Sequence, residues 1–447
     1  MISNYFKLAL RVLGRKKFFT AITLFGISFT LAILMLIVSV METEVGSTRP
    51  ITNKDRVVIL PNLQIKKMFY DTIYTVDTSM LDGIMKLDST YKVEEAGQNN
   101  SNNEFAWSYL DKHLSDVPSA VNYTFFNVNS IFNAYVNNAK VEMNTTYTDH
   151  RFWEVLDFEF LEGFGFSESS VDQEEPVAVI TSDLADEYFG RRKDVLGEEV
   201  ELDGLSYKVV GVIRPPGISL LSSDIIVPHT LLKSVGRGEE VGFGGFMAIF
   251  MADSPKGIQR VKDDIAFINR SLEVHPSLQE YYNQVIVKPW SYHEVYASQL
   301  LDMDDDETTG ESLSALKKIM IGLLGLFVLL PTLNLINLNV GRIFERSSEI
   351  GVRKAFGASQ STILWQFIVE NVIQTLLGGI IGMGLAMLMI YIINDARLMG
   401  DIILKINMKF FLYSIVITLI FGVLSGLLPA YRMSKLHVVN ALKQNRL

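Results

Sequence analysis

The sequence contains no cysteine, which excludes disulfide bonds and thiolate metal sites. It also lacks the motifs that carry common chemistry: a G-x-x-x-x-G-K-[ST] phosphate loop, an H-E-x-x-H metal motif and a G-x-S-x-G nucleophile elbow. The six histidines are scattered and show no i,i+4 pair. We therefore expect no catalytic residue, no metal and no cofactor held by this chain, and we do not expect an enzyme.

Basic residues are scarce in the middle of the chain. Residues 42–312 carry 45 acids and 22 bases, a net charge near −23, while the remainder carries 5 acids and 18 bases. A nucleic-acid-binding domain needs a basic face, so this block is not expected to bind nucleic acid. The asymmetry suits a membrane protein whose basic residues collect on one side.

Charge is absent from four long hydrophobic runs, residues 18–41, 319–341, 371–394 and 410–431. About 20 apolar residues are needed to cross a hydrocarbon core of about 30 Å, so each run predicts a transmembrane helix. A cleaved signal peptide is the alternative for the first run, but that run is too long and no small-x-small cleavage site follows it.

Lys and Arg gather before the first span, between the second and third, and after the fourth. Because basic residues near span ends remain on the cytoplasmic side, both termini are expected in the cytoplasm. The block at 42–312 is then expected outside, periplasmic or extracellular, on a chain that crosses the bacterial cytoplasmic (inner) membrane several times.

The predicted fold class is a membrane protein of four transmembrane α-helices with a large mixed α+β extracytoplasmic domain between spans one and two. The predicted segments are a cytoplasmic N-terminal amphipathic helix (1–17), span one (18–41), the external domain (42–312), span two (313–341), a cytoplasmic segment (342–361), span three (362–394), a short external loop (395–408), span four (409–431) and a cytoplasmic tail (432–447).

The external domain alternates between strand and helix patterns, with a strand-rich middle between two α+β halves. The predicted strands are residues 56–60, 177–180, 246–250 and 285–287, and a hairpin over 199–212 turns at Asp203-Gly204. The predicted helices are residues 79–86 (the start of a short helix), 182–189 with Ser182 as N-cap, and 255–270.

Three polar or glycine-rich stretches invite a functional interpretation, and each has a plainer one. Residues 98–103 are expected to form a surface loop or mobile tip, and residues 242–245 a flexible turn. The acidic run 302–307 lacks the Gly and Glu positions of a calcium loop, which favours a solvated linker.

The membrane spans carry features of helix packing. Small-residue faces predict close helix contacts, Pro331 predicts a kink in span two, and Asn334, Asn337 and Asn339 favour interhelical hydrogen bonds over a substrate path. The predicted packing glycines are Gly378, Gly382, Gly422 and Gly426. No span has a charge at its centre, so a midplane ion or proton relay is not expected.

The segment 342–361 mixes charged and apolar residues at helical spacing and lies between two spans. A short amphipathic helix of this kind either lies along the membrane or docks in the groove of a partner. The physical pattern alone does not choose between these two.

The run Glu349-Ile-Gly-Val-Arg-Lys-Ala-Phe-Gly-Ala-Ser359 resembles the E-I-G-x-R-[KR]-A-x-G-A-[ST] signature of MacB/FtsX-type ABC transporter permeases. The resemblance implies a coupling helix that docks on an ATPase subunit. It assigns this coupling to Glu345, Glu349, Ile350, Gly351, Arg353, Lys354, Phe356, Gly357 and Ala358.

Other stretches carry the same resemblance. Residues 176–211 are similar to the core pattern of MacB and LolC external domains, and residues 152–163 to its lead-in. The C-terminal Pro429-Ala-Tyr-Arg432 looks like the family's closing motif, with Val438 or Val439 where proline is usual, and residues 9–17 look like its N-terminal amphipathic helix.

The resemblance implies a permease subunit that couples ATP hydrolysis on a separate subunit to movement of the external domain, for export of peptides, antibiotics or lipoproteins. An FtsX-like regulator that activates cell-wall hydrolases without transport is the alternative. A sensor or receptor without any ATPase is a third, weaker reading.

The implied partners are an ABC ATPase dimer that binds ATP and Mg²⁺, a second permease (identical or not) and the lipid bilayer. A periplasmic adaptor, a lipoprotein chaperone or an outer-membrane channel is a further partner that the resemblance implies.

Overall fold

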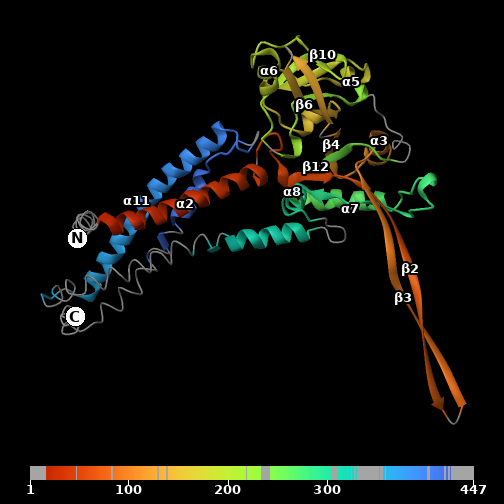
Figure 1. Ribbon diagram of the computed structural model, residues 1–447, viewed down its shortest axis with the longest axis horizontal. Helices are drawn as coiled ribbons and strands as arrows, with labels where there is room; N and C mark the ends of the chain where they lie inside the picture. The colour runs from red at the N-terminus through yellow and green to blue at the C-terminus, as the bar shows by residue number, and fades with distance from the viewer. Residues whose placement is uncertain are drawn as a thin grey trace. The chain divides into compact units, whose positions relative to one another are not determined.

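The structure is a computed structural model that describes residues 17–46, 48–81, 84–127, 130–136, 139–217, 219–232, 242–303, 310–323, 325–326, 329, 352, 356–357, 359–399, 403–416, 419–420 and 423. The chain divides into two compact units (Figure 1). The helical unit comprises residues 1–44 and 314–447, and the folded domain comprises residues 45–313.

Two helices dominate the described part of the helical unit: α2 (Lys17–Val45) and α11 (Gln360–Asp395). Within them, Thr20–Thr43 and Ile368–Asp395 are long and apolar enough to cross a membrane. Residues 311–323 and 408–416 are also helical. The predicted second and fourth spans, residues 319–341 and 410–431, lie largely outside the described residues.

The folded domain is built on an 11-stranded sheet with the path β14-β1-β12-β4-β6-β11-β8-β10-β7, from which β5 pairs with β6 and β9 with β10. A second sheet of order β13-β2-β3 adjoins it. The strands are β1 (Val57–Leu60), β2 (Leu63–Leu81), β3 (Ile84–Asn103), β4 (Ala120–Asn127), β5 (Ser130–Val136), β6 (Ala139–Thr148), β7 (Phe160–Gly163), β8 (Val177–Thr181), β9 (Glu199–Leu202), β10 (Leu205–Ile213), β11 (Ile225–Pro228), β12 (Phe246–Ala252), β13 (Gln284–Val287) and β14 (Trp290–Ser291).

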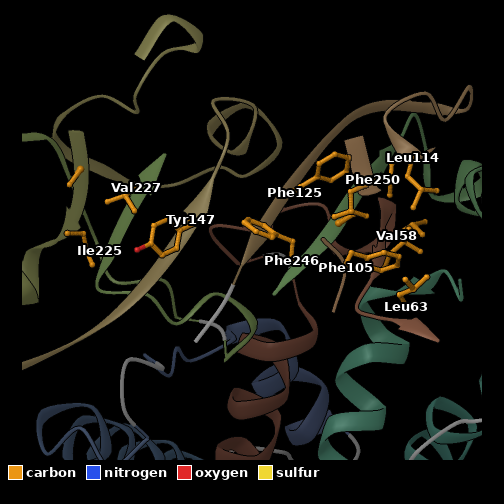
Figure 2. Packing of buried hydrophobic residues seen from close by; sticks show 14 of the residues in the cluster. Val58, Leu63, Phe105, Leu114, Phe125, Tyr147, Ile225, Val227, Phe246 and Phe250 are labelled. Carbon is orange, nitrogen blue, oxygen red and sulfur yellow. The ribbon is translucent and has the colours of Figure 1, made fainter. Parts of the chain in front are cut away.

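Both faces of the large sheet are buried. Alternate residues of β1 point to opposite faces, so Val58 belongs to one hydrophobic cluster and Ile59 to another, and all four residues of the strand are fully buried. Figure 2 shows the first cluster in two groups, with Tyr147 and Val227 in one, and Phe125 and Phe250 in the other. The sheet is therefore the central layer of the domain, with a core on each side.

Helices cover both faces. The helices α3 (Trp107–Leu114), α6 (Ser182–Phe189) and α7 (Ile258–Asn269) bury residues in the first cluster, and α4 (Phe152–Val155), α5 (Glu168–Asp172) and α8 (Tyr292–Leu301) bury residues in the second. Short 3₁₀ turns occur at Lys54–Arg56, Ser219–Leu221, His229–Leu231, Pro255–Gly257 and Pro276–Leu278.

Several elements predicted from local sequence are confirmed. The strands at 56–60, 177–180, 246–250 and 285–287 are present as β1, β8, β12 and β13. The β9–β10 hairpin turns at Asp203 and Gly204, with φ of +50° and +72°, as Asp-Gly turns require. The predicted helix over 255–270 is present as a 3₁₀ turn followed by α7.

Other predictions are wrong. Residues 79–86 do not start a helix, because residues 79–81 and 84–86 belong to a long hairpin of β2 and β3. Residues 98–103 are not a loop but the last part of β3, paired with residues 63–68. The N-cap of α6 is Thr181, whose hydroxyl accepts from the Leu184 N–H, and Ser182 is the first helical residue.

Candidate functional site

Glycines on α11 lie against α2. A Cβ added at Gly378 would lie 2.7 Å from Cγ2 of Ile27, and one at Gly382 would lie 2.8 Å from the carbonyl oxygen of Ser28. Both distances are shorter than real Cβ atoms make, so the two helix backbones approach as closely as glycine allows. The helices therefore form a tightly packed pair.

The C-terminal end of α2 is tied to the segment that follows α11. The Ser39 hydroxyl donates to the carbonyl oxygen of Lys405 at 2.7 Å, and the Asn407 amide donates to the Glu42 carboxylate. Since α2 leads directly into the folded domain, a movement of this helix end also moves the chain around residues 405–407.

Residues 48–56, here termed the anchor segment, attach the start of the folded domain to its core. Arg49 donates to the Asp157 carboxylate at 3.0 Å, and the Asp157 N–H donates to the carbonyl oxygen of Pro50 at 2.8 Å. Lys54 is 2% exposed and donates to the Thr48 hydroxyl at 2.8 Å. The chain that arrives from α2 is therefore fixed to the domain within about ten residues.

The end of the folded domain meets its beginning. The Lys54 ammonium lies 4.9 Å from the ring centroid of Tyr292, the first residue of α8. The strand β14, just before α8, pairs with β1, just after the anchor segment. Both chain connections to the helical unit therefore attach at the same edge of the sheet.

The helix α8 is held in place from a second side. Ser291 and Glu294 form a capping box at its start, and Lys262 of α7 donates to Glu294 at 2.6 Å. Burial raises the pKa of Glu294, but the hydrogen bonds from Lys262 and Ser291 outweigh it, and the net pKa is lowered. A charged Glu294 thus locks α8 to α7.

The large sheet narrows between β4 and β6. Among the described residues, these strands share one residue pair, Phe126 with Thr148, whereas β4 and β12 share seven. We call this link the seam. Side chains reinforce it: the Thr148 hydroxyl donates to the Phe125 carbonyl at 2.8 Å, and the Thr124 hydroxyl donates to Asp149 at 2.6 Å. Burial raises the pKa of Asp149, opposed by the Thr124 hydrogen bond.

An aromatic pair crosses the seam. The indole of Trp107 in α3 stacks on the imidazole of His229 with a centroid distance of 3.4 Å and an interplanar angle of 14°. Burial lowers the pKa of His229 to about 4, so the ring is neutral at physiological pH. This stack therefore adds to the hydroxyl contacts across the seam, and both hydrophobic clusters also contain residues from either side of it.

Two of the predicted coupling residues are described. Phe356 is 89% exposed, and Gly357 follows it with φ of +86°, a conformation that glycine adopts without strain. The Ser359 hydroxyl then caps α11 by accepting from the Thr362 N–H. The predicted coupling residues Glu345, Glu349, Ile350, Gly351, Arg353, Lys354 and Ala358 lie outside the described residues, as do Pro331, Gly422 and Gly426.

A polar stripe on α11 was not predicted. Gln366, Glu370 and Gln374 are all buried, and their spacing of four places them on one helix face. The signal was present in the sequence, because a polar residue recurs at i, i+4 and i+8 just where span three begins. The burial of Lys54 has no such signal in the sequence, because an isolated lysine is normally expected on the surface.

Metal sites do not occur in the described part of the chain, in which no group of three or more His, Asp or Glu is arranged to bind an ion. Of the acidic run 302–307, only Asp302 and Met303 are described. Residues 242–245 form a packed turn, because a Cβ added at Gly244 would lie 2.6 Å from the Phe105 carbonyl.

Two protein families match this chain. The MacB-like periplasmic core domain matches residues 20–267, and the FtsX-like permease C-terminal domain matches residues 321–438. Together the two matches cover most of the chain: the first includes α2 and most of the folded domain, and the second covers most of the C-terminal part.

Several known proteins are similar. The uncharacterized ABC transporter permease YknZ of Bacillus subtilis is 25% identical over 342 residues, 75% of this chain and 72% of its own length. The macrolide export ATP-binding/permease protein MacB of Psychrobacter arcticus is 27% identical over 63% of this chain, and the pyoverdine export ATP-binding/permease protein PvdT of Pseudomonas entomophila is 25% identical over 64%. This chain spans only 40–41% of the length of these two relatives.

The crystal structure of the periplasmic region of MacB from Actinobacillus actinomycetemcomitans aligns with a TM-score of 0.32 and 16% identity, over 46% of this chain and 85% of that one.

Proposed function

Because this chain belongs to the family of ABC transporter permeases with a MacB-like periplasmic core domain and an FtsX-like C-terminal domain, we propose that it couples ATP hydrolysis on a separate ATPase subunit to a conformational change of its external domain. The observation that carries the proposal is the attachment of the folded domain. Both of its ends reach the same sheet edge, β14–β1, through the anchor segment and α8.

The proposed topology has four spans. Two of them correspond to the apolar helices Thr20–Thr43 and Ile368–Asp395, and the others are residues 319–341 and 410–431. The distribution of Lys and Arg supports an orientation with both termini in the cytoplasm. The folded domain then lies outside the bacterial inner membrane.

The proposed coupling element is the segment 342–361. Its sequence supports docking on an ATPase, and the exposed Phe356 next to the left-handed Gly357 supports an apolar contact presented at a tight turn. The sequence contains no phosphate-binding loop, so ATP and Mg²⁺ are proposed to bind only on the partner.

The proposed output is mechanical. A push on the coupling segment reaches span one through the close α2–α11 contact and passes along α2 into the anchor segment. Since both connections converge on one sheet edge, relative movement of the two membrane helices is applied there as a local shear. The seam is where we expect the sheet to yield most readily, because only one described residue pair joins β4 to β6.

The proposed cargo is a peptide, antibiotic, lipoprotein or other amphiphile taken from outside the cytoplasm. The folded domain's match to the MacB-like family over residues 20–267 supports transport rather than an FtsX-like regulatory role. The proposed assembly contains two permeases and an ATPase dimer, with a periplasmic adaptor, lipoprotein chaperone or outer-membrane channel as further candidates.

Affinity purification of the full chain from its native membranes tests the proposal. We expect an ABC ATPase to copurify, with ATP hydrolysis that falls severalfold when the permease is depleted. A preparation that never contains an ATP-hydrolysing partner contradicts the proposal and favours a receptor without an ATPase.

A further inference from the structure

The strands β2 and β3 form a ribbon that leaves the rest of the folded domain (Figure 1). Near its root a third strand, β13, pairs with β2, but only over residues 63–66. From residue 67 onward, the described part of the ribbon has two strands. A two-stranded ribbon is only marginally stable in water unless something covers one of its faces.

The register of the ribbon separates its residues by polarity. Residues opposite each other share a face, and successive residues alternate between faces. Between Tyr70–Glu95 and Leu81–Ile84 the register holds without interruption, with twelve residue pairs, six on each face. The face with even-numbered β2 residues carries one charged residue, Glu95 at its inner end. The opposite face carries six, which are Asp71, Asp77, Lys86, Asp88, Lys92 and Glu94.

We call the first of these the neutral face. Most of its residues are apolar or aromatic by type, including Tyr74, Val76, Met80, Met85, Leu87 and Tyr91. Tyr74 pairs with Tyr91, and Met80 with Met85. Such segregation along twelve pairs is the pattern of a sheet with one covered and one solvated face.

The neutral face does not continue the domain core. At the root, odd-numbered Leu63 and Ile65 are buried in the core. A bulge between Phe69 and Tyr70 shifts the register of β3 against β2, and beyond it the neutral face carries even-numbered residues of β2 and odd-numbered residues of β3. Along β2, the side that faces the core at the root therefore continues into the charged face. The neutral face lies on the other side of the ribbon and is not an extension of the core.

We propose that the neutral face packs against the same face of a second copy of this chain. Residues 42–312 carry a net charge near −23, so two copies repel each other over most of their surfaces. The neutral face is a surface on which identical domains approach with little of that repulsion, and its single charge, Glu95 at the inner end, offers a charged partner little to recognise. A contact between copies related by two-fold symmetry uses one patch on both.

The area also fits a second copy. A ribbon face of twelve residues along each strand is about 40 Å long and about 10 Å wide, which gives roughly 800 Å² in total for two faces. This is below the roughly 1,200 Å² of a stable independent interface. A partner held by this face alone would dissociate readily, whereas a second permease is already held nearby through the membrane part. This argument rests on the proposed function, in which two permeases form one transporter.

The natural absence of cysteine allows a direct test. Single cysteines are introduced into the full chain at Thr72, Thr78 or Ser89 of the neutral face, and at Thr75, Ser79 or Thr90 of the charged face as matched controls. Native membranes are then treated with a bismaleimide cross-linker. We expect at least one neutral-face variant to give at least tenfold more covalent dimer, at twice 50.3 kDa, than any charged-face variant.

Equal cross-linking from both faces, no dimer from any variant, or a neutral-face adduct with a different protein would each overturn the proposal. Copurification of the ATPase is measured on the same membranes. If the ATPase copurifies but the neutral face gives no dimer, the ribbon contact is wrong and the proposed function stands. If no ATPase is found, the proposed function itself is wrong.

Discussion

At the scale of single residues, the environment of His229 lowers its pKa and so opposes its protonation. Its ring is stacked on Trp107, and burial lowers its pKa to about 4. An unfolded chain binds a proton at this histidine below a pH of about 6.5, while the folded domain does so only below about 4. Lowering the pH across this window therefore favours unfolding.

We predict that the contribution of His229 to the free energy of unfolding falls by about 3 kcal/mol as the pH is lowered from 6.5 to 4. The measurement is denaturant unfolding of the full chain at several pH values, for the wild type and for His229→Phe. Subtracting the two curves cancels the contributions of Asp149 and other groups. The same substitution at His275 serves as control, and a difference curve for His229→Phe that is flat with pH contradicts the assignment.

The packing glycines of α11 give a second prediction at the residue scale. Gly382→Ala places a Cβ 2.8 Å from the Ser28 carbonyl, whereas a Cβ at Gly384 meets nothing within 4 Å. We expect Gly382→Ala to lower stability by about 1–3 kcal/mol through overpacking, and Gly384→Ala to be neutral or slightly stabilising. Thermal unfolding in detergent measures both, and equal effects contradict a close α2–α11 contact.

The sequence predicted the contacts of some side chains and missed those of others. The spacing of Gly378 and Gly382 predicted a close helix contact, and the two residues lie against α2. The burial of Lys54 and the stacking of His229 on Trp107 had no local signal, because each depends on segments far apart in the chain. Tertiary contacts of this kind follow from the assembled sheet and not from a pattern of neighbours.

At the scale of elements, the seam between β4 and β6 divides an otherwise continuous sheet. Its single backbone pair is supplemented by hydroxyl groups, so the loss of one hydroxyl is felt locally. The two hydrophobic clusters continue across the seam on both faces, so side-chain packing holds the halves together beside the backbone pair.

We predict that Thr148→Val, which removes the hydrogen bond to the Phe125 carbonyl, lowers stability by about 1 kcal/mol and accelerates amide hydrogen exchange in residues 124–127. Ser271→Ala is the control, since its hydroxyl donates to the Ile268 carbonyl just after α7, away from the seam. Faster exchange at residues 124–127 in the control, or unchanged exchange in Thr148→Val, would show that the seam is not a separate opening unit.

Elements defined by local chemistry were predicted correctly, as the Asp203-Gly204 hairpin shows. The β2–β3 ribbon was missed because its tip contains Leu, Met and Ile at spacings that also fit a helix, and because its register is fixed by pairing along the whole ribbon. The asparagine-rich residues 98–103 were assigned to a loop by composition, although pairing with β2 and β13 beyond it holds them in a sheet.

For the molecule as a whole, we propose that a cytoplasmic segment acts on an external domain through two packed helices. The family resemblance, drawn from motifs such as Glu349–Ser359, is confirmed by the two family matches, while the order of segments stays a prediction from hydrophobic runs and charge asymmetry. The sequence did not predict that the anchor segment and α8 meet at one sheet edge, since β1 and β14 are more than 200 residues apart. In the proposed mechanism, that convergence lets two membrane helices act on the same sheet edge.

We predict that Gly357→Val uncouples the ATPase from the external domain. A β-branched residue is strained at φ of +86°, so the turn after Phe356 must change. ATP should still be hydrolysed, but the ATP-dependent change in hydrogen exchange of residues 45–313 should be lost. Gly190→Val, strained in the same way at φ of +70° within the folded domain, should retain that change. A Gly357→Val protein with a normal exchange response contradicts the coupling role.

The most direct measurement of the central claim is photo-crosslinking in native membranes from a photoreactive amino acid at Phe356. A photoreactive residue at Phe267, an equally aromatic and 73% exposed position on α7, is the control. We predict an adduct with an ABC ATPase from position 356 and none from position 267. No ATPase adduct from position 356, or an adduct there with a protein from outside the cytoplasm, would contradict it.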